Sequence, residues 1–295
     1  MSGDLERRYA RVLRLYPKAY RRERGPELLA TLLEASARPK RRELPALLLG
    51  ALRAHAGSDR RTAGGTWVAA SRVAALMVLV YAITTAPVRA GITLAYGLPH
   101  GWWLIEQSLP ELVAAPVGLL ALAAAVLGRH RIALGVTSVA FLVGLGTWLT
   151  DTALEAGFFR YLFAALLLLP AVRTAPPPVS GLLRYALSAP ALLVAADRIG
   201  EDVVPAVAGI VGFGAFVAVW FVALFWAVVD ERVTLAVGLF FLAEALLWPI
   251  VLAVFTAGGA SGNLTGLAVT MALTALVPTV LLSVSAIAVR RQARL

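Results

Sequence analysis

The chain has 295 residues but no cysteine, only two lysines and only three histidines. Without cysteine it can form no disulfide bond, use no thiolate nucleophile and build no cysteine-ligated metal site. The histidines lie far apart, at His55, His100 and His130, so we expect no metal centre. The nucleotide-binding pattern G-x-x-x-x-G-K-[ST] is also missing. These absences predict a protein without a cofactor and make an enzyme the least favoured class of function.

Charge is scarce too. Charged residues make up 15% of the chain, whereas a soluble domain has roughly 25%. Hydrophobic residues make up 60%, against about 45–50% in a soluble domain. So few polar side chains cannot cover a globule in water, which predicts that lipid surrounds most of the chain. The abundant alanine and the preference for arginine over lysine favour a GC-rich bacterial source, and hence a bacterial cell membrane.

The net charge of +10 is concentrated at the N-terminus. Residues 1–61 hold 15 basic and 7 acidic side chains, a balance of +8. This asymmetry predicts a basic headpiece over residues 1–62 and a membrane domain over residues 63–295. The first residues are charged and amphipathic, unlike a signal peptide, so we expect the headpiece to be retained in the cytoplasm.

The headpiece is expected to contain three short helices. Leu5, Tyr9 and Leu13 recur at helical spacing in the first. Gly25-Pro26-Glu27 is typical of a helix start, and residues 44–55 form the third helix. The predicted fold is therefore all-α: a three-helix headpiece on a polytopic membrane helix bundle.

Eight long apolar segments make up the membrane domain. Crossing a 30 Å hydrocarbon core takes about 20 helical residues, within a range of roughly 17–25. The fourth and fifth segments are shorter, and we expect Arg160 and Arg184 to lengthen them by reaching for the surface. The segments cover residues 67–86, 109–127, 132–150, 157–172, 181–196, 203–229, 233–256 and 264–289.

The arginines give the orientation. With eight spans and the N-terminus inside, nine of the twelve arginines beyond the headpiece fall at or near the cytoplasmic side. This agrees with the excess of arginine and lysine that cytoplasmic loops carry. If residues 181–196 did not span, the C-terminal arginines would move outside. We therefore expect both termini in the cytoplasm. Inside the bundle, small residues four apart, such as Ala140 and Gly144, predict close helix packing.

Glu244 is the candidate intramembrane site. It lies in the middle of the seventh segment, where a charge costs about 2.5–3.5 kcal/mol and intramembrane acids are functional candidates. We place Arg89, Arg160 and Arg198 near the outer surface, so none is expected to pair with it. This favours a protonated carboxyl or a wet cavity, with the Ala245 carbonyl, which Pro249 leaves without a donor, as a local partner.

The basic headpiece offers a second set of candidates. Its third helix is mainly leucine and alanine, whereas a DNA-recognition helix needs polar side chains for base edges. Nucleic acid is therefore disfavoured as a partner, and contact with anionic lipid or with a cytoplasmic protein is preferred. The residues that we assign to such contacts are Arg21, Arg22, Arg24, Arg41 and Arg42.

One stretch resembles a known group of proteins. The run from Leu5 to Arg21, with Leu15-Tyr16-Pro17 at its centre, and the following Glu27–Glu34 are similar to the N-terminal cytoplasmic segment of uncharacterised multipass membrane proteins of high-GC bacteria. The run is more loosely similar to the small helical anti-sigma-associated domain encoded near PadR-like regulators. The resemblance covers residues 5–35 and implies no site residue.

Two functions follow as hypotheses. In the first, the protein is regulatory or scaffolding, and its headpiece binds a cytoplasmic partner. In the second, the bundle is a transporter or permease subunit with a polar cavity near Glu244. The resemblance favours the first, and the span number and the intramembrane acid favour the second.

Overall fold

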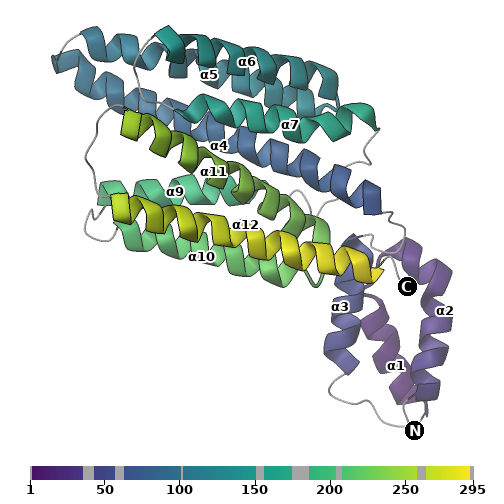
Figure 1. Ribbon diagram of the computed structural model, residues 1–295. Helices are drawn as coiled ribbons and strands as arrows, with labels where there is room; N and C mark the ends of the chain where they lie inside the picture. The colour runs from purple at the N-terminus through teal and green to yellow at the C-terminus, as the bar shows by residue number, and fades with distance from the viewer. Residues whose placement is uncertain are drawn as a thin grey trace.

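The computed structural model describes residues 2–35, 43–56, 63–100, 102–150, 156–174, 186–203, 208–257 and 264–292. Within these residues the chain is helical and has no strand, which confirms the all-α fold. Figure 1 shows three short helices at one end of a larger bundle of long helices.

The headpiece consists of α1 (Ser2–Leu13), α2 (Lys18–Ala35) and α3 (Glu43–Ala56). Its small core contains Leu13, Tyr16 and Ala51. The Tyr16 hydroxyl donates a hydrogen bond to the Leu47 carbonyl at 3.0 Å, and burial, together with Tyr20, raises the pKa of Tyr16. This bond holds α3 against the turn between α1 and α2.

The start of the second helix differs from the prediction. Helix α2 begins at Lys18, directly after Pro17, and runs through Pro26. A proline inside a helix removes one backbone donor. Because Pro26 is exposed, water can bond to the carbonyl that the proline ring leaves without a donor, so the helix continues.

Eight helices follow the headpiece in the described part of the chain, in the order of the eight predicted segments. Successive helices run in alternating directions (Figure 1), so α4 begins and α12 ends at the same end of the bundle as the headpiece. We call this the headpiece end. The helices are α4 (Ala63–His100), α5 (Trp102–Val126), α6 (His130–Thr150), α7 (Phe159–Arg173), α9 (Ser188–Val203), α10 (Ala208–Trp226), α11 (Glu231–Ala257) and α12 (Leu264–Gln292), with a 3₁₀ turn η2 (Ala156–Phe158) before α7.

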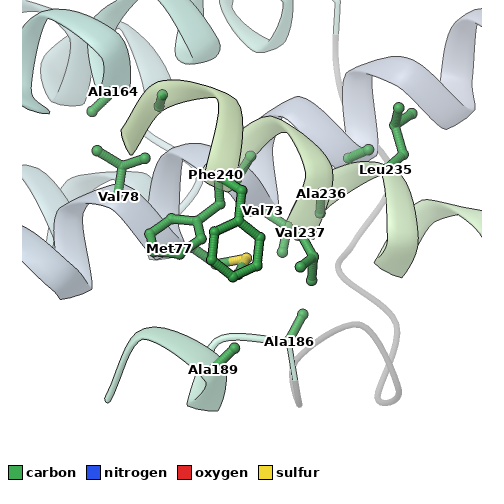
Figure 2. Close-up of a cluster of buried hydrophobic side chains, with 14 of the residues drawn as sticks. Val73, Met77, Val78, Ala164, Ala186, Ala189, Leu235, Ala236, Val237 and Phe240 are labelled. Atoms are coloured by element: carbon green, nitrogen blue, oxygen red, sulfur yellow. The ribbon is translucent and has the colours of Figure 1, made fainter. Parts of the chain in front are cut away.

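Helices α4 and α11 form the centre of the bundle. Helix α4 contacts α5, α7, α9 and α11, and Val73 and Met77 on α4 lie beside Phe240 on α11 in the main core (Figure 2). Many large apolar side chains on the outer helices are exposed instead. They include Leu120, Leu127, Leu142, Leu166, Phe221 and Phe225.

Two described helical stretches are long and apolar enough to cross a bilayer, by length and composition. They are Gly64–Thr85 in α4 and Glu231–Ile250 in α11. The apolar stretches found in four other helices are shorter, between 10 and 17 residues: Ala115–Val126, His130–Gly146, Gly214–Trp226 and Ala275–Ala288.

Candidate functional site

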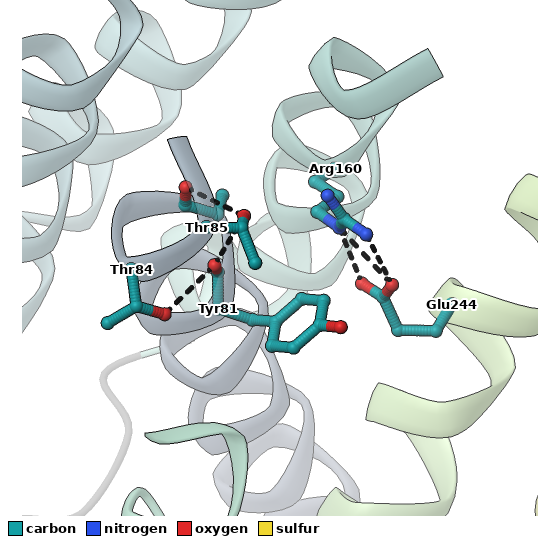
Figure 3. Close-up of polar contacts among 6 residues, drawn as sticks. Tyr81, Thr84, Thr85, Arg160 and Glu244 are labelled. Carbon is teal, nitrogen blue, oxygen red and sulfur yellow. Dashed lines mark hydrogen bonds and ion pairs between the residues drawn. The ribbon is translucent and has the colours of Figure 1, made fainter. Parts of the chain in front are cut away.

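Glu244 forms an ion pair with Arg160 in the interior of the bundle. Glu244 lies on α11 and Arg160 near the start of α7, and the carboxylate accepts two parallel bonds: Arg160 Nε to Oε1 at 3.0 Å and Nη2 to Oε2 at 2.9 Å. Figure 3 shows the two side chains pointing toward each other. The prediction that no arginine pairs with Glu244 was therefore wrong.

The short length of α7 explains this pairing. Arg160 lies thirteen residues before Arg173, where α7 ends, and Glu244 lies twelve residues after Arg232, near the start of α11. Both counts start from the headpiece end (Figure 1). At 1.5 Å per residue they correspond to about 20 Å and 18 Å. Helix α7 has only 15 residues and begins part-way through the bundle, so Arg160, its second residue, lies beside Glu244 and not at the far end of the bundle.

The pair also contacts α4 through an aromatic ring. The guanidinium carbon of Arg160 lies 4.7 Å from the ring centroid of Tyr81, within the range of a cation–π interaction. Tyr81 in turn meets the edge of Phe240 on α11, at 5.8 Å between ring centroids. The group therefore joins α4, α7 and α11.

Little of the pair is accessible. The side chain of Arg160 is 14% exposed and that of Glu244 is 18% exposed. Two nearby hydroxyls, of Thr84 and Thr85, are bonded to carbonyls of their own helix (Figure 3). Because burying an unpaired charge is costly, the bidentate geometry is what allows both ionised groups to remain inside.

This arrangement changes what Glu244 can do chemically. Its carboxylate is bonded to Arg160 rather than to the Ala245 carbonyl that we had expected beside Pro249. A carboxylate that already has a guanidinium partner does not offer an open site for a cation. To bind a proton or a substrate, it would first have to separate from Arg160, and breaking a buried pair costs about 3–5 kcal/mol.

The headpiece arginines lie far from this pair, at the end of the molecule. Arg22 and Arg24 on α2 are exposed, and Arg21 is half-buried. Arg41 and Arg42 lie outside the described residues. Of the five arginines assigned to partner or lipid contact, the structure therefore shows two, Arg22 and Arg24, with exposed side chains.

A junction between headpiece and bundle was not foreseen from the sequence. Arg53 on α3 donates from Nε to the Val228 carbonyl at 2.8 Å, in the turn between α10 and α11. Two residues further on, Asp230 caps α11: its carboxylate accepts the Arg232 backbone N–H at 3.1 Å and pairs with the Arg232 guanidinium at 2.8 Å. An aspartate directly before a helix is a capping signal, but nothing local in the sequence indicates the contact with Arg53.

Comparisons of the chain with models of protein families, with curated proteins and with solved structures found no match. The resemblance of residues 5–35 therefore stays a prediction.

Proposed function

We propose that the chain is a regulatory or scaffolding membrane protein whose headpiece binds a cytoplasmic partner and whose bundle is held together by the Arg160–Glu244 pair. The observation that carries the proposal is the hydrogen bond from Arg53 to the Val228 carbonyl. It attaches the headpiece to the turn that begins α11, the helix on which Glu244 lies.

The membrane part of the proposal is an eight-span bundle in a bacterial cell membrane, with both termini in the cytoplasm. Two observations support it. Eight described helices alternate in direction, and the outer helices expose large apolar side chains. In addition, arginines gather at the headpiece end, which agrees with the excess of arginine and lysine in cytoplasmic loops. Those described with their side chains are Arg72, Arg129, Arg131, Arg173, Arg232 and Arg290.

The regulatory part rests on a continuous set of contacts. From Arg53 the contacts pass to the turn at Val228, to the Asp230–Arg232 pair that caps α11, and along α11 to Glu244. Thr234 on α11 also donates to the Ala223 carbonyl of α10 at 2.7 Å, so the two helices are tied beside this turn. A shift of α11 relative to α7 would therefore displace the surface on which the headpiece rests.

Co-purification of a partner with the full-length protein tests the proposal. The protein would be isolated from its native membrane in mild detergent, as wild type, as Arg22→Glu/Arg24→Glu, and as Arg290→Glu. The last variant is the control, because Arg290 is also exposed at the headpiece end but belongs to α12. We expect one protein to be retained by wild type and control and lost, by about tenfold or more, from the double variant, since reversed charges repel. Recovery of lipid alone from all three would contradict the proposal.

A transporter is the second candidate, because two opposite charges in an apolar interior could separate during a transport cycle. Glu244→Gln distinguishes the two functions. In a transporter, the folded Gln variant would lose proton- or substrate-coupled flux in proteoliposomes. In a regulatory protein it would retain the partner and show no such flux in either form.

A further inference from the structure

A second polar site lies at the headpiece end of the bundle, away from the Arg160–Glu244 pair. It is a pocket of about 660 Å³ between α4, the start of α6 and the end of α7. The pocket opens to the surface, and it is lined by the exposed apolar side chain of Ile132; the exposed Leu127 directly precedes the lining residue Gly128 in the chain. Its lining residues are Arg72, Gly128, Arg129, His130, Arg131, Ile132, Ala171, Val172 and Thr174.

The charge of this pocket has one sign. Arg72, Arg129 and Arg131 contribute three guanidinium groups, and none of the described lining residues is acidic. Arg129 and Arg131 are exposed, whereas Arg72 is 7% exposed and reaches the Ala125 carbonyl from Nη2 at 3.4 Å. Like charges held together in this way favour an anion between them.

His130 is the strongest indication of a ligand. The residue is only 5% exposed and lines the pocket. The Gly128 carbonyl lies close to its ring, but within the described part of the chain no contact of either ring nitrogen has the geometry of a hydrogen bond. Buried polar groups are nearly always bonded, and an unbonded one calls for an explanation such as a missing ion. Burial lowers the pKa of His130, as does the charge of Arg72, while the nearby Gly128 carbonyl raises it.

The backbone turns sharply in the same place, so that a helix start faces the pocket. The Gly128 N–H bonds to the Ala125 carbonyl and the Arg129 N–H to the Ala124 carbonyl, and Gly128 has a positive φ of 78°. This is the glycine-terminated end of α5, and it turns the chain so that the 21-residue helix α6 starts at the pocket. The first N–H groups of a helix have no partners in the helix and carry partial positive charge.

We propose that this pocket binds a phosphate group, carried by an anionic phospholipid of the cytoplasmic leaflet. Arginines and a histidine at a helix start are suited to phosphate oxygens. Basic pockets between membrane helices on the cytoplasmic side take lipid headgroups of this kind, and the apolar surface at Leu127 and Ile132 gives the acyl chains a place to lie. The claim that a lipid supplies the phosphate group rests on the proposed membrane placement. The claim that the pocket binds a phosphate group does not.

Thermal stabilisation of the full-length, delipidated protein in detergent measures the binding. The ligands are phosphatidylglycerol, phosphatidylcholine and inorganic phosphate, each titrated separately, since a ligand that binds the folded state raises the unfolding temperature. We expect phosphatidylglycerol to stabilise wild type and the other two to have little effect. Arg129→Gln/Arg131→Gln should weaken the affinity by about tenfold to thirtyfold. His130→Leu should weaken it as well and serves as the second test should the double variant fail to fold.

Arg173→Gln is the matched control. Arg173 is exposed at the end of α7, between two lining residues, but does not itself line the pocket. Its loss should change the affinity by less than about twofold. If Arg173→Gln lowered the affinity as much as the double variant does, the effect would be one of general surface charge, and the proposal would be overturned. The proposal would also be overturned if none of the three ligands stabilised the protein.

Two outcomes separate the parts of the inference. If inorganic phosphate stabilises as well as phosphatidylglycerol at equal concentration, the phosphate site stands and its lipid source is wrong. Carbonate extraction of the same protein from membranes tests the membrane placement by itself. A protein released by carbonate would overturn that placement and the lipid source, while the inorganic phosphate titration would still decide whether the pocket binds an anion.

Discussion

At the scale of single residues, Arg160 and Glu244 should be coupled strongly. Glu244→Leu leaves the guanidinium buried without its carboxylate, and we expect a loss of about 3–5 kcal/mol in the free energy of unfolding. Arg160→Leu/Glu244→Leu removes both charges and should be close to wild type, because apolar side chains fit an apolar interior. Denaturant unfolding in detergent of the two single variants and the double variant measures the coupling. Costs that simply add in the double variant would show that the pair contributes no coupling.

His130 should give the delipidated protein a dependence on pH. Its pKa is lowered in the folded state by burial and by Arg72 on α4, while Arg129 and Arg131 are its charged neighbours on the turn and on α6. Below about pH 6.5, the ordinary pKa of histidine, the unfolded state therefore binds more protons than the folded state. The free energy of unfolding is highest above this pH and falls as the pH drops below it. Unfolding temperatures between pH 7.5 and 5.5 measure this loss. His130→Gln should remove it, and the exposed His55→Gln should not; an unchanged dependence in His130→Gln would assign the loss to another group.

At the scale of elements, α6 packs against the turn before α7 through Gly144. A β-carbon at this position would lie 2.5 Å from the β-carbon of Phe158, whereas one at Gly135, in the same helix, would meet nothing within 4 Å. Gly144→Ala should therefore destabilise the bundle by about 1–3 kcal/mol through overpacking. Gly135→Ala should be neutral or stabilising by up to about 1 kcal/mol, since alanine favours the helix. Unfolding of both variants in the same detergent gives the comparison, and a harmless Gly144→Ala would mean that the two segments separate readily.

The limits of sequence reasoning also show at this scale. Long apolar runs give the order of the helices, because hydrophobic length is encoded locally, but they do not give all of the bounds. Helix α4 continues to His100, fourteen residues past the predicted end at residue 86, and α9 covers Ser188–Val203 where residues 181–196 were predicted. The depth of Arg160 is not local, since it depends on where the short α7 starts relative to α11. The contact between Arg53 and Val228 joins residues 175 apart, and no pattern in either segment indicates the other. Arg129 and Arg131 are sequence neighbours of His130, but the approach of Arg72 likewise requires α4 and α6 to be brought together.

At the scale of the whole molecule, the topology can be tested by thiol labelling. The chain has no cysteine, so single cysteines introduced by mutation give a clean signal with an impermeant reagent in intact cells. Cysteines at Gln107 and Ser261 should react, whereas those at Ser58, Ser180 and Gln292 should be protected, because an even number of spans leaves both termini inside. Reaction at Gln292 in intact cells would contradict eight spans.

The position of the headpiece also has a consequence for the order of assembly. The headpiece is synthesised before the bundle, yet it docks on the turn between α10 and α11, 175 residues after Arg53. At about 5–20 residues per second, that turn follows about 9–35 s later. During this interval the headpiece has no docking surface, and a chain truncated before α10 never acquires one. Docking of the headpiece therefore reports that the late helices have been made and packed, so incomplete chains differ from finished ones in the exposure of the headpiece surface around Arg53.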